Sequence, residues 1–388
     1  MEFATRALCF VLLSTGTAFA QSTDVSSASV AYIYVGTVSN GVYAYSAAAN
    51  GRLTPVAGSP FKHTSGLAIG SNGKYFISLG TTNLHAYEIE ANGAIGAQAS
   101  VVNTEDYDGS ICGANGTDGA ALDHAGTIHV LQDSTVDSGS GYCAAYQSFN
   151  ISKSGAFTFE GTDIADGTEG DRLSFLYNLP SFTANDVFAY ANFGGAIPAD
   201  LDPYGSSVPS GFMRKSNGEL ENLTFNTTFP AAGPIGEYYA FLVTAGTSNY
   251  LAMTIAQVQL PYGEDGPIQL ASFTVDAKGN IKTTNTREDM PIPATIPGVL
   301  NMSPSGKLLA VGPGLQVFHF NGAEPITKFT GLLPTAPITH IHWDNNNHLY
   351  ALSSNKLYVY TVTPTSVEEV PGSPYTLPNS NALNVVPR

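Results

Sequence analysis

His340 and His342 lie two residues apart in a run, Ile338 to Trp343, whose β-branched and aromatic residues are typical of a strand. Side chains two apart on a strand project to the same side, so the two imidazoles can act together. Such a pair can ligate a metal ion or serve as a general base, and it can also form a polar stripe packed between sheets. His340 and His342 are therefore candidate site residues, with packing as the alternative.

The acidic run from 163 to 171 carries carboxylates around two glycines, which suits Ca²⁺. The weak candidate ligands are Asp163, Asp166, Glu169 and Asp171. Their spacing differs from that of an EF-hand loop, and a solvated acidic loop is the alternative. The adjacent Arg172 could pair with one of these carboxylates or hold the carboxylate of a substrate. Ca²⁺ is thus the one cofactor that the sequence suggests, and none is certain.

The first twenty residues resemble a secretory signal, with Arg6 before an apolar stretch and small residues at Ala18 and Ala20. We expect cleavage after about Ala20, a flexible segment over 21–30, and a secreted or periplasmic mature chain. An N-terminal strand or anchor is the alternative. No later segment has the roughly 18 consecutive apolar residues that a membrane-spanning helix needs, so we expect no membrane span.

Cys112 and Cys143 are the two cysteines beyond the predicted signal. In an oxidising compartment we expect them to form a disulfide, with free thiols or metal ligation as the alternatives. No CxxC or CxxCH motif occurs, which argues against a zinc knuckle or covalently attached haem.

The formal net charge of −16 repels polyphosphates and other anions. We therefore expect neither nucleic acid nor an anionic membrane surface as a partner. The chain has few charged residues and many glycines, tyrosines and phenylalanines, a composition that suits a large all-β protein. There is no GxSxG elbow, HExxH helix or phosphate-binding glycine loop. The sequence therefore carries no common catalytic signature.

A glycine turn between two short apolar runs recurs along the chain and sets the positions of the candidate residues. The turns are Asn50-Gly51, Asn92-Gly93, Ser154-Gly155, Asn217-Gly218, Lys278-Gly279 and Asn321-Gly322, with 363–365 in the seventh place. Such pairs suit the positive φ angles of tight hairpins. A strand-rich repeat of roughly 40 to 60 residues predicts propeller blades, each with strands that we label a to d.

The end of the chain resembles an inner strand of the same repeat. Residues 382–387 are similar to 299–304, which form a predicted strand a, whereas the mature chain begins on a strand b. We therefore predict an all-β fold, a single seven-bladed β-propeller over 31–388 with four-stranded antiparallel blades. Pairing of the C-terminal strand with the N-terminal strands would close the ring and leave no long open edge.

In such blades the d–a and b–c connections share one face, and three consecutive repeats carry longer connections there. The long segments are 103–119, 133–141, 192–210 and 257–267. Loops on a rigid scaffold are where binding usually occurs. Candidate ligand-binding residues near the predicted starts of strand a are Asp118, Tyr177, Asn178, Glu237 and Tyr238. His63 could face His340 across the axis, or it could be an exposed loop histidine.

The segments 73–76 (GKYF) and 303–309 (SPSGKLL) resemble the "SPDGK-hydrophobic" signature of lactonase-type seven-bladed propellers. The linkers 57–61 (AGSPF) and 371–375 (PGSPY) resemble the d–a connections of that family. It includes 6-phosphogluconolactonases, a carboxymuconate-lactonising enzyme and many exported YVTN-repeat proteins. The resemblance covers nearly the whole mature chain and is sharpest at its two ends.

Strand a in this family often begins Pro-Arg-His, with the histidine near the axial opening, so the resemblance places His340 there and Thr339 at the arginine. The missing arginine argues against a phosphorylated or carboxylated lactone as ligand. At the position of His340 the other repeats carry Gly66, Gly119, Asn178, Phe241, Val299 and Ala382.

From these features we expect a monomeric, exported propeller that binds a small molecule, a glycan or an envelope protein at the axial mouth of the long-loop face. The first alternative is a lactone hydrolase, with His340 as general base and Arg172 or backbone N–H groups stabilising an oxyanion. The second alternative is a structural envelope propeller without a ligand site.

Overall fold

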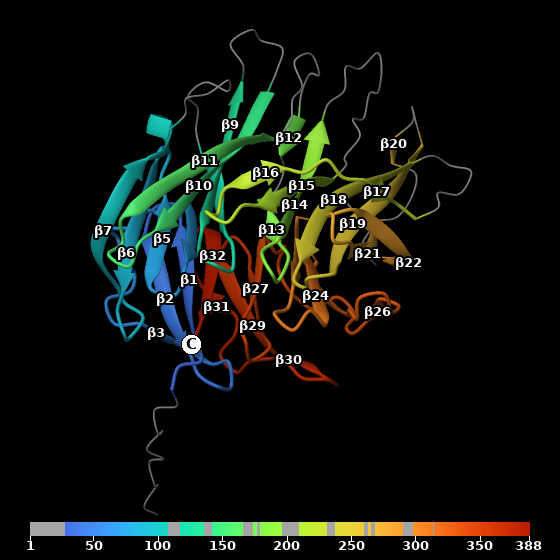
Figure 1. Ribbon diagram of the computed structural model, residues 1–388. Helices are drawn as coiled ribbons and strands as arrows, with labels where there is room; N and C mark the ends of the chain where they lie inside the picture. The colour runs from blue at the N-terminus through green and yellow to red at the C-terminus, as the bar shows by residue number, and fades with distance from the viewer. Residues whose placement is uncertain are drawn as a thin grey trace, which may run out of the picture.

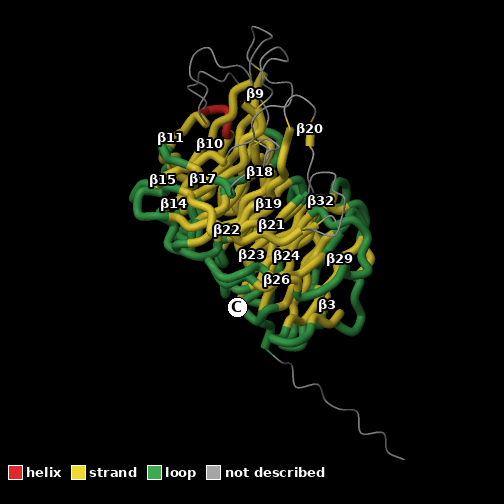
Figure 2. The backbone as a smooth tube through the Cα atoms, turned by 90° about the vertical axis from the view of Figure 1, so that its right-hand side faces the viewer, coloured by secondary structure: helices red, strands yellow, loops and turns green. Residues whose placement is uncertain are grey.

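The computed structural model describes residues 28–107, 117–135, 142–165, 174–176, 179–195, 209–230, 237–259, 263–264, 268–289, 298–312 and 314–388. These residues form seven sheets, each built around four antiparallel strands, arranged in a ring (Figure 1). Figure 2 shows strands and loops throughout, with η1 (Thr104–Tyr107) as the helical turn of the described chain. The predicted seven-bladed propeller is confirmed.

The first three blades, from the inner to the outer strand, have the following bounds. Blade I is β32 (Ser380–Pro387), β1 (Ala31–Thr37), β2 (Gly41–Ala47) and β3 (Leu53–Pro55). Blade II is β4 (Ala68–Ser71), β5 (Tyr75–Leu79), β6 (Asn83–Ile89) and β7 (Ile95–Asn103). Blade III is β8 (Thr117–Leu122), β9 (Ile128–Thr135), β10 (Tyr142–Ile151) and β11 (Phe157–Ala165).

The other four blades follow the same order, some with short additional strands. Blade IV is β13 (Ser181–Phe182), β14 (Phe188–Gly195), β15 (Pro209–Arg214) and β16 (Leu220–Asn222), with β12 (Ser174–Leu176) also on β14. Blade V is β18 (Glu237–Ala245), β19 (Tyr250–Gln259), β21 (Gln269–Val275) and β22 (Ile281–Asp289), with β17 (Thr227–Thr228) on β22 and β20 (Gly263–Glu264) on β19. Blade VI is β23 (Val299–Met302), β24 (Leu308–Gly312), β25 (Gln316–His319) and β26 (Thr327–Lys328). Blade VII is β27 (His340–Trp343), β28 (His348–Leu352), β29 (Lys356–Val362) and β30 (Val367–Glu369), with β31 (Tyr375–Thr376) on β29.

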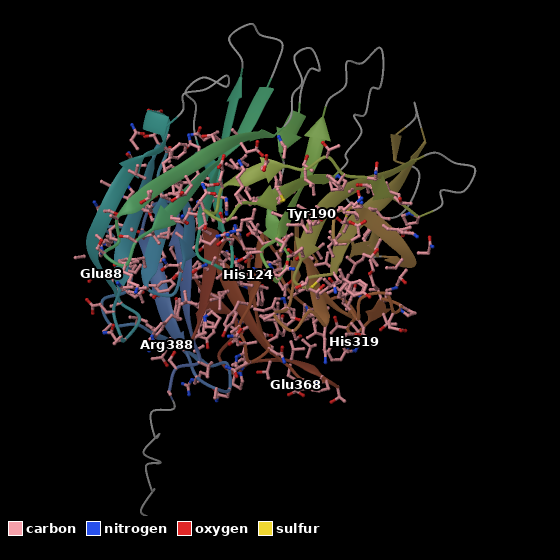
Figure 3. The ribbon with its side chains drawn as sticks, viewed as in Figure 1. Glu88, His124, Tyr190, His319, Glu368 and Arg388 are labelled. Carbon is pink, nitrogen blue, oxygen red and sulfur yellow. The ribbon has the colours of Figure 1, made fainter. Side chains whose placement is uncertain are left out.

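The ring closes as the sequence predicts. Strand β32 pairs antiparallel with β1, with Asn384 opposite Tyr34, and contacts the inner strands β27 and β4 of the two neighbouring blades. The buried side chains of Leu383 and Val386 anchor it. The last residue, Arg388, places its guanidinium 5.1 Å from the ring centroid of Tyr32. Figure 3 labels Arg388 near the C-terminus. No sheet edge of blade I is left open at the join between the two ends of the chain.

The glycine turns lock neighbouring blades together. Gly93 has a φ of +85°, and a Cβ added there would collide with the ring of Tyr32 in the preceding blade. The hydroxyl of Tyr34 donates to the Gly93 carbonyl at 3.0 Å, and that of Tyr190 donates to the Gly279 carbonyl at 2.9 Å. Glycine is therefore required both by the turn and by the aromatic ring packed on it. The remaining space between blades is filled by apolar clusters, one for each junction.

The two linkers 57–61 and 371–375, which resemble the d–a connections of lactonase-type propellers, adopt the same local structure. Both Ser59-Pro60 and Ser373-Pro374 are cis peptides, and each serine hydroxyl accepts from a backbone N–H of strand c, at 2.9 Å and 3.0 Å. The linkers therefore run along the blades in the same way before turning toward the next inner strand.

The long connections over blades III to V, on which the predicted binding face depends, lie mostly outside the described residues. Two strands that lead into them, β9 and β14, are described and end on the upper side of Figure 1. Among the described residues there is no helix of the length and apolarity that crossing a membrane requires.

Candidate binding site at the axial mouth

Backbone pairing puts His340 and His342 on the inner strand of blade VII. His340 pairs with Leu352, the last residue of β28, and His342 pairs with Tyr350. His340 is thus at the end of β27 where the chain enters from the d–a connection, and His342 is one step deeper. The neighbouring inner strands β23 and β32 both contact β27, and they carry Asn301 and Asn384 at the position that corresponds to His342.

Both imidazoles are uncharged at neutral pH. Burial lowers the pKa of His340 to about 4, and burial together with the nearby His340 lowers the pKa of His342 to about 4. Their side chains nevertheless keep some solvent-accessible surface. On an inner strand the neighbouring blades surround each side chain. A ring there can therefore keep some accessible surface and still be poorly hydrated. A neutral imidazole presents one nitrogen that donates and one that accepts.

The tautomer of His340 follows from its neighbour Thr339. The Thr339 hydroxyl lies 3.2 Å from the Leu352 carbonyl oxygen, to which it can only donate, and 3.0 Å from Nδ1 of His340. Because the hydroxyl proton is used on the carbonyl, Thr339 Oγ1 accepts from Nδ1–H of His340. Nε2 of His340 therefore carries the free lone pair.

Next to His340, the entrances of the inner strands of blades I and II are formed by Asn381 and Leu67. With its amide oriented so that the nitrogen faces the two carbonyls, Asn381 donates to Gly36 at 3.2 Å and to Gly66 at 2.8 Å. This arrangement ties blade I to the connection that enters blade II. Leu67 is 49 % exposed beside it, and Val38, on the adjoining b–c connection, is 55 % exposed.

The described part of the mouth, over blades VII, I and II, therefore combines a neutral hydrogen-bonding ring with apolar surface. Its defining side chains are His340, Asn381, Leu67 and Val38, none of which is charged at pH 7. Such a combination of a few polar groups and apolar contact area is typical of small-ligand sites.

His63 does not join this group. Phe61, two residues earlier, bridges to Val42 in the third strand of blade I, which keeps the segment away from the axis. The exposed His63 ring packs 5.6 Å from the ring of Tyr87, whose hydroxyl donates to the His63 carbonyl at 3.2 Å. No contact between His63 and His340 occurs in the described structure, so the exposed-loop alternative fits His63 better.

The remaining axial candidates fall partly or wholly outside what the structure describes. The backbones of Asp118, Glu237 and Tyr238 lie in the first residues of the inner strands β8 and β18, as expected, but their side chains are outside the described part. Entirely outside it are Arg172, Tyr177, Asn178 and Cys112, together with Asp166, Glu169 and Asp171. The side chain of Cys143, on β10, is also outside it, so the disulfide stays a prediction.

Asp163, the one described member of the Ca²⁺ candidates, lies on β11, the outermost strand of blade III. Its Oδ2 is buried without a hydrogen-bond partner, and burial raises its pKa to about 6, with Glu219 and Glu221 adding to the shift. Among the described residues, no three or more His, Cys, Asp or Glu side chains form a group that could hold a metal. Asp163 is thus far from the axis, and Ca²⁺ binding by the acidic run stays a prediction.

Sequence reasoning missed a polar chain buried between blades III and IV. Nδ1 of His129 lies 3.1 Å from Ser148 Oγ, and Nε2 lies 3.5 Å from Asp123 Oδ2, which also accepts from Nε of Arg214. The atom types match a hydrolytic triad, but Ser148 and His129 are fully buried. No substrate can reach the serine, so the chain is structural. Its members come from distant segments, and only the scarcity of arginine could have drawn attention to it.

A similar buried group caps the a–b turn of blade VII. Asp344 Oδ2 accepts from Tyr350 at 3.0 Å and lies 2.7 Å from Nδ1 of His348. Asp344 and Asp123 both directly follow the inner strand of their blade, and each carboxylate accepts the backbone N–H four residues later. These aspartates thus close the turns that follow the inner strands of blades III and VII.

Comparison with known proteins supports the fold. No family model matches the chain, and no curated protein matches it. A candidate 6-phosphogluconolactonase from Bacteroides fragilis is similar in structure, with a TM-score of 0.63 and 15 % identity over 93 % of this chain and 99 % of that one. Virginiamycin B lyase from Staphylococcus aureus has a TM-score of 0.42 and 14 % identity over 79 % of this chain and 84 % of that one. The resemblance to lactonase-type propellers is thereby confirmed at the level of the fold.

Proposed function

We propose that this protein is an exported propeller that binds a small uncharged ligand, such as a neutral sugar or the end of a glycan, at the axial mouth. The observation that carries the proposal is that His340, Asn381 and Leu67 lie at the entrances of the inner strands of three consecutive blades, VII, I and II. Export rests on the signal-like N-terminus alone.

The proposed preference for an uncharged ligand follows from electrostatics. An anionic ligand would need a cation to offset its desolvation, whereas His340 is neutral and Thr339 stands where lactonase-type propellers often carry arginine. The net charge of −16 adds a long-range repulsion for anions. A hydroxyl of a neutral ligand can donate to Nε2 of His340 while its apolar face covers Leu67.

A lactone hydrolase is supported less well by the same residues. A general base works best when its pKa is near the operating pH, and burial holds the pKa of His340 at about 4. Its Nδ1 faces a hydroxyl and not the carboxylate that would strengthen it as a base. The fold similarity to a candidate lactonase carries no information on this point.

The test is a thermal-shift panel on the mature chain with neutral mono- and oligosaccharides, neutral lactones and phosphorylated counterparts of each. A ligand of the native state at a hundredfold excess over its Kd stabilises by about 2.7 kcal/mol and raises Tm. We expect an uncharged compound to do so, its phosphorylated counterpart to fail, and His340→Ala to abolish the shift. His63→Ala, an exposed histidine off the axis, is the matched control. A shift that survives in His340→Ala would contradict the proposal.

A further inference from the structure

The spacing of His340 and His342 allows both rings to reach one point. Two residues of strand span about 6.6 Å, and both side chains leave β27 on the same side. Imidazole nitrogens bind zinc at about 2.0 to 2.1 Å. Each ring is long enough for one of its nitrogens to reach a single ion placed between the two side chains.

Both rings have a nitrogen available. Thr339 accepts from Nδ1–H of His340, so the lone pair of that ring is on Nε2. The ring of His342 makes no hydrogen bond to another described residue. A metal-ligating histidine usually has its second ring nitrogen held by a hydrogen bond of the kind that Thr339 provides.

The flanking inner strands supply neutral oxygen atoms at the depth of His342. Asn301 and Asn384 occupy the corresponding positions on β23 and β32, and Oδ1 of Asn384 is buried without a hydrogen-bond partner. An amide oxygen or water can complete the coordination of an ion that two imidazoles hold. No described carboxylate is needed in this arrangement, and none forms a metal-binding group there.

We propose that His340 and His342 together bind one divalent late transition-metal ion, such as Zn²⁺, Co²⁺ or Ni²⁺. Imidazole ligands select these ions, whereas Ca²⁺ and Mg²⁺ prefer carboxylate and carbonyl oxygens. The poorly hydrated surroundings disfavour an ion held by charge alone, so bond-forming metals are preferred over hard ones. The inference shares its location with the proposed function but needs no organic ligand.

The experiment is a titration of chelator-stripped, untagged mature protein with Co²⁺ followed by its d–d absorption, and with Zn²⁺ by calorimetry. Thiols are alkylated beforehand so that Cys112 and Cys143 cannot contribute. We expect one ion per chain and at least a tenfold loss of affinity in either His340→Ala or His342→Ala. His63→Ala should bind as the wild type does. Ca²⁺ should not compete.

Absence of stoichiometric Co²⁺ and Zn²⁺ binding would overturn the inference, as would binding that survives in both axial variants. Repeating the saccharide and lactone panel in the presence of a chelator tests the proposed function separately from metal binding. A chain that binds a neutral ligand but no metal would retain the first proposal and lose this one. Circular dichroism of each variant checks that a lost signal is not lost folding.

Discussion

The hydroxyl of Thr339 accepts from Nδ1 of His340 because its own proton is donated to the Leu352 carbonyl. This relationship fixes the imidazole as the Nδ1–H tautomer, with the lone pair on Nε2. The position that the family resemblance aligns with arginine thus carries a neutral residue, Thr339, which hydrogen-bonds His340.

Replacement of Thr339 by valine should weaken axial binding without unfolding the chain. The valine keeps the shape of the side chain but releases Nδ1–H of His340, so the ring loses its fixed tautomer. Loss of such a supporting contact typically lowers metal affinity by 10- to 100-fold, and we expect about tenfold for Co²⁺. Thr339→Ser should restore most of the affinity. Equal affinities in the valine and serine variants would show that the hydroxyl does not position His340.

Asp163→Asn should stabilise the protein at pH 7 but not at pH 4. Burial raises the folded pKa of Asp163 to about 6, above the ordinary value of 3.8. The folded state thus binds the proton more tightly, so stability is highest at low pH and falls as pH rises through this window. Because Asp163 is partly exposed, we expect a gain of only about 1 kcal/mol at pH 7.

Urea unfolding at the two pH values measures this effect. Glu368→Gln is the control, since Glu368 is an exposed carboxylate on β30 of another blade. A gain at pH 4 as large as that at pH 7 would mean that removal of the charge is not the cause. A loss of stability at pH 7 would mean that the hydrogen bond from the Asn222 backbone to the Asp163 carboxylate outweighs the cost of burying its charge.

Arg214→Met should be strongly destabilising because it leaves the Asp123 carboxylate buried without its ion partner. Removal of one member of a buried pair typically costs 3 to 5 kcal/mol, and we expect about 3 kcal/mol because Arg214 is partly exposed. Lys215→Met, which breaks an exposed pair with Glu219, should cost less than 1 kcal/mol. Denaturant unfolding of the two variants provides the comparison, and similar losses would contradict the structural role of the Arg214 pair.

The same pair predicts an acid-side dependence. Burial would raise the pKa of Asp123, but the bonds from Arg214 and from the Thr127 backbone N–H, together with the nearby His129, lower it to about 2. This carboxylate therefore contributes stability above pH 3.8 that is lost as pH falls toward 2. In Arg214→Met the loss of stability between pH 4 and pH 2 should be smaller than in the wild type. If Arg214→Met loses as much stability between pH 4 and pH 2 as the wild type does, other carboxylates are responsible for that loss.

Deletion of 380–388 should prevent folding to a monomer. It removes the inner strand of blade I, unpairs β1 and exposes an apolar junction that Leu383 and Val386 fill. Open strand edges of this kind pair with other chains, so we expect aggregation on gel filtration. Arg388→Ala, which loses only the contact with Tyr32, should remain monomeric and within about 1 kcal/mol of the wild type. A folded, monomeric deletion variant would contradict closure by β32.

The propeller could be predicted from sequence because its determinants are local. Asn-Gly turns, short β-branched runs and the similarity of the two ends each specify structure within a few residues, and all of them repeat. Backbone pairing confirms Gly119, Val299 and Ala382 at the position of His340. The expected Gly66 and Phe241 are replaced there by Ala68 and Leu242.

These differences have physical reasons. A bulge between Ala240 and Leu242 shifts the register of β18, and a bulge leaves little trace in residue type. His63 was placed near the axis by its distance from strand a, but the bridge from Phe61 to Val42 holds it outside. The Asp123, His129 and Arg214 cluster joins residues from two blades, so no local pattern could reveal it. Long-range packing decides which side chains reach the axis.

The most direct test of the account is proton–carbon NMR of the histidine rings in the mature chain during addition of a compound that raises Tm. The chain has eight histidines, which single His→Gln variants can assign. We predict that the resonances of His340 and His342 shift with the ligand while those of His63, His85 and His319 stay in place. Saturable binding that leaves His340 and His342 unmoved would contradict an axial site.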